Sequence, residues 1–174
     1  MSVEPIAGPA GTSASGLPRG HLVPLIHVVY ASRPFGFDDL ALSGILATAR
    51  RNNQRDDITG ALICREDLFL QWLEGPETAV MAAFARIERD DRHTDVTRLA
   101  MDPIAARVFP DWAMRHDPAR SWMWTPQQVS DGIIATATAD HAREIFLRLA
   151  EEPLDALNTS AVARCPMGGG KIEH

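Results

Sequence analysis

The sequence has few cysteines, a single lysine and no long apolar run. Its two cysteines, Cys64 and Cys165, lie far apart in 174 residues, so we expect neither a disulfide framework nor a Cys/His metal motif. No apolar run approaches the ~20 residues of a membrane-spanning helix, and the first 20 residues lack the basic and apolar regions of a secretion signal. These absences predict a cytoplasmic protein with no bound metal and no membrane partner.

Acidic residues outnumber basic ones, 23 to 17. The net charge is -6 and the pI is about 5.4, whereas nucleic acids and anionic membranes normally bind to clustered positive charge. We therefore expect no nucleic-acid partner. The length, with 45% apolar and 23% charged residues, suits one globular domain with some additional elements.

The hydrophobic patterning predicts an α+β fold with the element order β-α-β-β-α-β-β. We expect strands at 25–32, 58–64, 68–74, 96–101 and around 112–116, the fourth ending at an Asp102-Pro103 kink. The first helix follows a cap at Asp38 or Asp39 and runs out at Asn52-Asn53, and the second has Pro76 at its first position. Strands joined through a helix run parallel with a right-handed crossover, which predicts a ferredoxin-like sheet with both helices on one face.

The opposite sheet face needs a cover, and the C-terminal part of the chain offers one. A helical stretch begins at Thr125-Pro126, and a later amphipathic stripe ends at Pro153. The stripe consists of Ala142, Ile145, Phe146 and Leu149. We therefore divide the chain into a disordered lead-in (1–21), a core (22–117), a C-terminal helical segment (118–153), which includes Trp122 and Trp124, and a mobile tail (154–174).

A glutamine interrupts the most apolar strand. Alternation along this strand places Phe69, Gln71 and Leu73 on one face and Leu70 and Trp72 on the other. An unpaired buried amide costs about 1–3 kcal/mol. Either the fold or a ligand must therefore supply hydrogen-bond partners to Gln71.

Two further polar residues converge on Gln71 in the predicted fold. Tyr30 lies near the end of the first strand, and Asn53 lies just past the first helix. Each has an ordinary structural interpretation, since a tyrosine packs in cores with a hydrogen-bonded tip and an asparagine caps helix C-termini. The three together are typical of a binding site.

Five runs of residues, in this order, closely resemble the BLUF family of flavin-based blue-light sensors. The resemblance covers roughly residues 22–117 and excludes both ends of the chain. The runs are Val29-Tyr30-Ala31-Ser32, Asn52-Asn53 with Ile58-Thr59-Gly60-Ala61-Leu62, Phe69-Leu70-Gln71-Trp72-Leu73-Glu74-Gly75, Arg89-Asp90-Asp91-Arg92-His93, and Phe109-Pro110-Asp111-Trp112-Ala113-Met114.

The resemblance implies FAD bound noncovalently between the two helices, over the sheet. Asn53 matches the asparagine that pairs with the flavin ring, and Arg92 and His93 match a pair at the end of the second helix; read alone, these two are a solvated charge run that stabilises the helix dipole. The remaining matched positions are polar neighbours at Ser32, Asn52 and Asp90 and apolar walls at Ile45, Phe69 and Met114, the apolar ones equally explicable as core. FMN is not distinguished from FAD by the residues alone.

The same resemblance implies a photochemical pair. Tyr30 would supply an electron and a proton, and Gln71 would exchange the donor and acceptor ends of its amide, which leaves a red-shifted flavin absorption. The residues leave open whether the amide rotates or tautomerises. Trp112 and Met114, which we expect on one face of the last strand, match the residues that relay the change.

The favoured function is a short light sensor that is not an enzyme and that signals to an unknown protein through its C-terminal helices or a homo-oligomer. Trp72 and the stripe of residues 145–149 are the expected contact surface. One alternative is an acylphosphatase-like hydrolase, for which Arg33 is present but Pro34 removes a backbone donor and no glycine-rich cradle follows. Another is an interaction module that has lost its flavin, which the intact Tyr30, Asn53 and Gln71 argue against.

Overall fold

A five-stranded sheet with the strand order β4-β1-β3-β2-β5 forms the centre of the protein. The structure, a computed structural model, describes residues 23–36 and 39–152, so the lead-in and tail expected from the sequence lie outside the described residues. The strands are β1 (Leu25–Pro34), β2 (Thr59–Arg65), β3 (Leu68–Pro76), β4 (His93–Ile104) and β5 (Arg115–Pro118). The helices are α1 (Asp39–Arg55), α2 (Glu77–Ile87), α3 (Pro126–Ser130), α4 (Ile133–Thr136) and α5 (Ala139–Glu151).

The connections confirm the ferredoxin-like arrangement. β1 pairs antiparallel with both β3 and β4, and β2 pairs antiparallel with β3. β1 and β2 therefore run parallel without touching, as do β3 and β4, which is the split β-α-β pattern. The added strand β5 lies parallel to β2 at the sheet edge.

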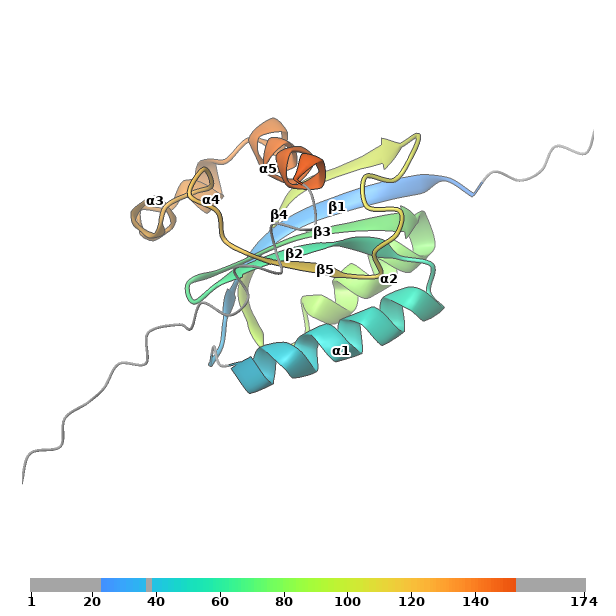
Figure 1. Cartoon of the computed structure of the whole chain (residues 1–174), viewed down its shortest axis with the longest axis horizontal. Helices are drawn as coiled ribbons and strands as arrows, with labels where there is room; N and C mark the ends of the chain where they lie inside the picture. Colours follow the sequence, from blue (N-terminus) through green and yellow to red (C-terminus); the bar gives the residue numbers. More distant parts are fainter. Residues whose placement is uncertain (1–22, 37–38, 153–174) are drawn as a thin grey trace, which may run out of the picture.

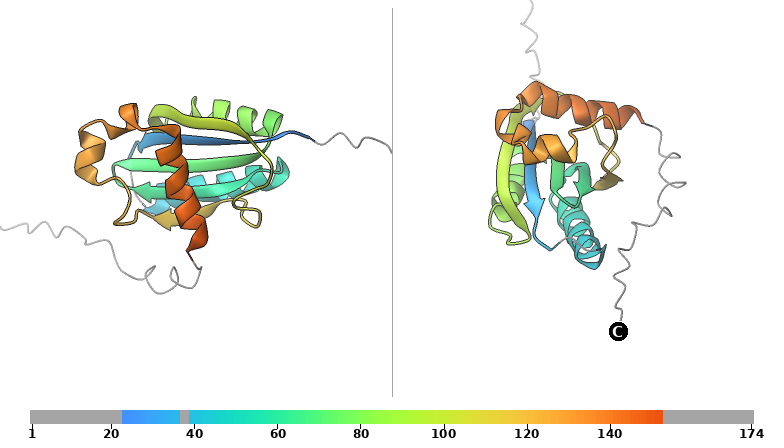
Figure 2. Two further views of the ribbon diagram at one scale, coloured as in Figure 1. Left: turned by 90° about the horizontal axis from the view of Figure 1, so that it is seen from above. Right: turned by 90° about the vertical axis from the view of Figure 1, so that its left-hand side faces the viewer.

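The helices divide between the two faces of the sheet as expected. Figure 1 shows α1 and α2 below the sheet and α3 to α5 above it, and Figure 2 shows α5 lying across the strands. Side chains that alternate along each strand feed two apolar cores. The helix-face core, against α1 and α2, includes Val28, Tyr30, Leu62, Phe69, Leu73, Phe84 and Met114, and the outer core, against α5, includes Val29, Leu70, Trp72, Phe109, Trp124 and Phe146.

Helix α5 buries the stripe that the sequence predicted. The Thr138 hydroxyl caps its first turn by accepting a hydrogen bond from the His141 amide, and all four stripe residues are buried. The Phe146 ring lies 5.7 Å from the Trp72 ring. The predicted contact surface for a partner is therefore wrong, because Trp72 and the stripe bury one another within the chain.

Several predicted boundaries also need correction. α1 continues to Arg55, beyond Asn52-Asn53, and Pro76 is the N-cap of α2 and not its first residue. β4 runs through Asp102-Pro103 without ending there. β4 is an edge strand, which is where a sheet tolerates proline, because only one side of the strand carries ladder hydrogen bonds.

Candidate functional site

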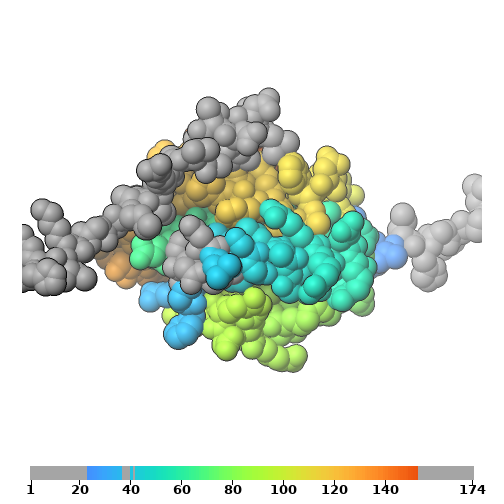
Figure 3. Space-filling view, turned by 60° about the horizontal axis from the view of Figure 1, so that its bottom comes forward, coloured from blue at the N-terminus to red at the C-terminus, as the bar shows by residue number. Residues whose placement is uncertain are grey.

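A cavity of about 190 Å³ lies between α1 and α2, with the sheet as its floor. In the space-filling view of Figure 3, α1 (blue to cyan) and α2 (yellow-green) lie next to one another on this face. Each helix contributes residues spaced three and four apart, which is the spacing of one helical face. The lining residues are Ile45, Thr48, Ala49, Asn52 and Asn53 from α1, Ala83, Arg86 and Ile87 from α2, Leu62, Gln71 and Leu73 from the sheet, and Asp90, Arg92 and His93.

Tyr30 and Gln71 stand directly opposite one another on β1 and β3 and are joined by a hydrogen bond. The buried Tyr30 hydroxyl donates to Oε1 of Gln71, while Nε2 of Gln71 donates to Sδ of Met114 at 3.4 Å. Burial, helped by the negative charge of Asp90, raises the pKa of the Tyr30 hydroxyl, so that it keeps its proton at neutral pH. The fold thus supplies a good partner to the glutamine oxygen but only a weak thioether acceptor to its nitrogen.

Ser32, Phe69 and His93 adjoin this pair. The Ser32 hydroxyl lies 3.0 Å from Nδ1 of His93, and the Phe69 ring centre lies 5.4 Å from that of His93. His93 is buried at the first position of β4, and burial lowers its pKa although Asp90 offsets part of the effect. The interpretation of His93 as part of a solvated charge run is therefore wrong, and the ring is neutral at neutral pH.

Asp90 and Arg92 form the charged rim of the cavity. Nε of Arg92 donates to Oδ1 of Asp90 at 2.8 Å, and the Arg92 backbone amide donates to the same oxygen at 3.1 Å. These bonds hold the pKa of the Asp90 carboxyl below its usual range. Arg92 and His93 were predicted at the end of the second helix, but α2 ends at Ile87, so Arg92 lies in the turn before β4 and His93 is the first residue of β4.

Asn53 is buried in the last turn of α1 with its side chain directed at the segment before β5. Its Nδ2 donates to the backbone oxygen of Ala113 at 2.8 Å, so the interpretation of Asn53 as a helix C-cap is wrong. Its neighbour Asn52 is half-buried and lines the cavity. The two asparagines therefore present amides to the cavity and to the loop beside it.

Trp112 and Met114 correct the prediction for the last strand. β5 begins only at Arg115, and the preceding residues bond elsewhere: the Trp112 amide donates to Phe109 O at 3.2 Å, and the Gly60 amide donates to Trp112 O at 2.9 Å. Met114 is buried in the helix-face core, whereas the half-buried Trp112 packs against the outer core. The two residues therefore lie on opposite faces of the sheet and not on one face of a strand.

The sequence reasoning missed several lining residues. Thr48 and Ala49 on α1 line the cavity, and the helical spacing from Ile45 would have found them. Arg86 and Ile87 on α2 line it as well. Arg50 was missed as well: its Nε donates to the backbone oxygen of Met114 at 3.2 Å. That contact joins residues far apart in sequence, and no local pattern indicates it.

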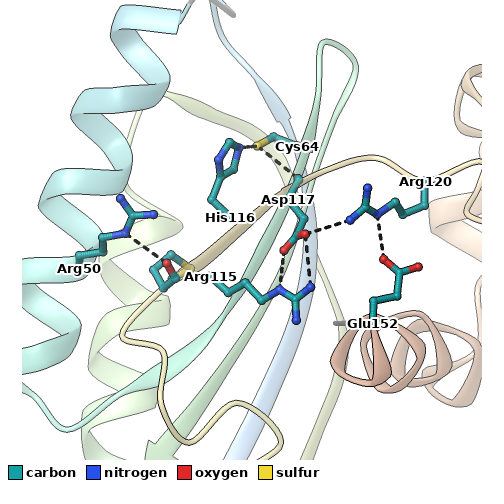
Figure 4. A network of polar contacts seen from close by, with 8 residues as sticks. Arg50, Cys64, Arg115, His116, Asp117, Arg120 and Glu152 are labelled. Carbon is teal, nitrogen blue, oxygen red and sulfur yellow. Dashed lines mark hydrogen bonds and ion pairs between the residues drawn. The ribbon is translucent and has the colours of Figure 1, made fainter. Parts of the chain in front are cut away.

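A chain of ion pairs leads from β5 to α5 (Figure 4). The fully buried Asp117 accepts from Nε of Arg115 at 2.8 Å and from Nη2 of Arg120 at 3.3 Å. Arg120 also lies 3.1 Å from the carboxylate of Glu152, just beyond the end of α5. Ion pairs thus connect the residue after Met114, Arg115, to Glu152 at the end of the C-terminal helix.

Residues 25–115 match a family model described as "Sensors of blue-light using FAD". The chain belongs to the BLUF family. It is 43% identical to the β subunit of a photoactivated adenylate cyclase from Euglena gracilis. The aligned region has 110 residues and covers 63% of this chain and 13% of that protein. The chain is 37% identical over 107 residues to the α subunit, covering 62% and 10%. The chain thus spans about an eighth or less of these two curated relatives.

Solved structures agree with the family. The dark state of the BLUF protein BlrB aligns with a TM-score of 0.62 and 29% identity over 73% of this chain and 96% of that one. A bacterial light-regulated adenylyl cyclase aligns with a TM-score of 0.53 and 29% identity over 71% of this chain and 36% of that one. The ground state of BlsA, at 23% identity and a TM-score of 0.63 over 74% of this chain and 89% of that one, shows the shared fold.

The residues of this BLUF domain fit a flavin. The pyrimidine edge of a flavin alternates hydrogen-bond acceptors with a donor, and a primary amide offers both senses. Gln71 directs its nitrogen at only a weak sulfur acceptor on the cavity wall, and Asn52 lies across the cavity from it. As a member of this family, the domain is a sensor of blue light. In the described ranges, no helix is long and apolar enough to cross a membrane.

Proposed function

We propose that this BLUF domain senses blue light through noncovalently bound FAD, with Tyr30 and Gln71 as its photochemical pair. The observation that carries the proposal is the buried hydrogen bond from the Tyr30 hydroxyl to Gln71 on the cavity wall. Gln71 lines the cavity, and its amide bonds to both Tyr30 and Met114.

The expected chemistry follows from these side chains. Bound flavin, excited by blue light, supplies a strong one-electron oxidant. Tyr30 would give up an electron to the excited flavin, and its phenolic proton, then far more acidic, would pass along the existing hydrogen bond to Oε1 of Gln71 while an N–H proton of the same amide leaves toward the flavin. Return of one electron and one proton restores Tyr30, while the Gln71 amide keeps an arrangement in which donor and acceptor ends are exchanged.

The remaining predicted site residues would hold the cofactor. Asn53 and Asn52 would pair with its polar edge, and Arg92 and His93 would favour electron density on a ring carbonyl oxygen. The other polar and apolar contacts would come from Ser32, Asp90, Ile45, Phe69 and Met114, which surround or adjoin the cavity.

The output is proposed to pass through the segment with Trp112 and Met114 and through β5 to the C-terminal helices. In support, Met114 contacts Gln71, and the ion pairs of Asp117 and Arg120 reach Glu152 beside α5. The receiver would be a partner protein or a second copy of this chain in the cytoplasm. Two curated relatives are named photoactivated adenylate cyclases, which makes an effector enzyme the first partner to seek.

An absorption spectrum before and after blue illumination tests the proposal. We expect a flavin spectrum that shifts slightly to the red and relaxes in the dark, and chromatography of the released cofactor should give FAD. Tyr30→Phe should keep the bound flavin but form no red-shifted state. Tyr30 is the only tyrosine of the sequence, so no other phenol replaces it. A colourless protein, or a normal photocycle in the variant, would refute the assignment.

A further inference from the structure

Glu74 carries a fully buried carboxylate outside the photochemical pair. It lies three residues after Gln71 on β3, and its side chain accepts four hydrogen bonds on the outer face of the sheet. The donors are the Val108 amide at 2.9 Å, the Phe109 amide at 2.6 Å, Nε1 of Trp72 at 2.8 Å and the Thr59 hydroxyl at 3.1 Å. Such a complete set of donors leaves no acceptor capacity for solvent or ligand.

Two of these bonds fix the start of the segment that ends at Met114. Charge-assisted bonds to backbone amides are roughly twice as strong as neutral ones, so Glu74 anchors residues 108 and 109 firmly. Arg107 adds a second anchor, since its Nη2 donates to the backbone oxygen of Asp57 at 2.8 Å. Glu74 and Arg107 therefore fix the position of the first residues of the segment 107–114, which follows the end of β4 at Ile104.

The rest of the segment is held in turn by its own backbone bonds. The Trp112 carbonyl accepts from the Gly60 amide at 2.9 Å. On its other strand neighbour, Gly60 packs too closely for any side chain, since a Cβ there would lie 2.0 Å from the backbone oxygen of Trp72. The Ala113 and Met114 carbonyls then accept from Asn53 at 2.8 Å and from Arg50 at 3.2 Å. Hydrogen bonds thus hold both ends of the segment, residues 107–109 beside Glu74 and residues 112–114 beside Gln71.

We propose that Glu74 is a positioning residue for the light response, holding the segment 107–114 so that Met114 stays against the Gln71 amide. This inference rests on the proposed photochemical role of Gln71. The amide cannot turn without parting from Sδ of Met114, which lies 3.4 Å from its nitrogen. Met114 is buried beside the amide, so the amide can turn in either direction only when Met114 gives way. An anchored segment therefore raises the barrier in both directions and prolongs the light-induced arrangement.

Glu74→Gln tests the inference, because an amide offers one acceptor oxygen and turns its NH₂ group toward the remaining donors. Hydrogen exchange of the Val108 and Phe109 amides, measured in the dark, should become about tenfold faster. The red-shifted state should still form, but its dark recovery should become about tenfold faster, which is about 1.4 kcal/mol of barrier. Glu77→Gln, the same change at an exposed position of α2, is the control and should alter neither rate.

The outcomes separate this inference from the proposed function. A wild-type protein that shows no light-induced shift refutes the proposed function. A normal wild-type photocycle with unchanged exchange and recovery in Glu74→Gln overturns the role of Glu74 alone, as does a lower melting temperature with unchanged recovery. If Glu74→Gln does not fold, Glu74→Asp takes its place: the shorter carboxylate should quicken recovery about threefold, and an unchanged rate overturns the inference.

Discussion

Asp117→Asn should lower the free energy of unfolding by about 3–5 kcal/mol, the range for breaking one side of a buried ion pair. Asp117 is fully buried, and the side chain of its partner Arg115 is only 5% exposed. The substitution leaves the Arg115 guanidinium in the interior without a counter-charge. Arg120 loses the same carboxylate, although it keeps Glu152 and is more exposed, and so adds less to the cost.

Urea unfolding followed by circular dichroism would measure the loss. For a chain of this size, 1 kcal/mol corresponds to about 2–4 °C in melting temperature, so in a separate thermal melt the melting temperature should fall by about 6–20 °C. Asp140→Asn is the matched control, because it makes the same chemical change in an exposed ion pair. Asp140 pairs with Arg143, and the Asp140 side chain is 88% exposed. Exposed pairs contribute about 0–1 kcal/mol.

A loss for Asp117→Asn no larger than that for Asp140→Asn would refute the reasoning. The double variant Arg115→Met/Asp117→Leu provides a second check. Replacing both members of a buried pair by apolar residues is often neutral or stabilising, so it should recover most of the stability. If the double variant were as unstable as Asp117→Asn, lost packing and not an unpaired charge would be the cause.

Two further predictions concern the flavin site and its histidines. Asn53→Ala should weaken flavin binding by about 1–3 kcal/mol, the cost of leaving a hydrogen-bond partner unsatisfied. A flavin titration measures this loss, with Gln54→Ala at an exposed position as the control. Equal affinities in the two variants would remove Asn53 from the site. Burial lowers the pKa values of His27, His93 and His116 from 6.5. The unfolded chain therefore binds more protons than the folded one at pH values near 6.5. The free energy of unfolding should fall as the pH drops from about 7.5 to 5.5. Urea unfolding across this range checks the sign, and a rise in stability toward pH 5.5 would contradict it.

The fold was predictable because side chains alternate between the two faces of each strand, so the sequence indicates which residues face each core. Alternation correctly divided Tyr30 and Gln71 from Trp72, and the stripe of α5 correctly predicted a helix packed on the outer face. The convergence of Tyr30 and Gln71 followed from the same alternation once the strands were paired. Pro103 misled because its tolerance depends on β4 being an edge strand, which is a property of the whole sheet.

The segment before β5 was not predictable for a similar reason. Trp112 and Met114 have the period-2 spacing of a strand, but their backbone groups bond to partners remote in sequence, including Gly60 and Asn53. Glu74 also looked like an ordinary strand end, because its two loop donors lie 34 and 35 residues further along the chain. Local patterns indicate which face a side chain takes, not which distant amide it binds.

The separation of Trp112 from Met114 has a mechanical consequence. Met114 fills part of the helix-face core and Trp112 packs against the outer core, and protein interiors are packed too densely to deform gradually. An exchange of the two side chains would therefore require both cores to repack and would break the bond from Asn53 to the Ala113 carbonyl between them. Such a change is a step between two discrete arrangements. Such an exchange would alter the outer core, to which α5 contributes Phe146 and the other stripe residues, so it would give a rearrangement at Gln71 a route to the C-terminal helix.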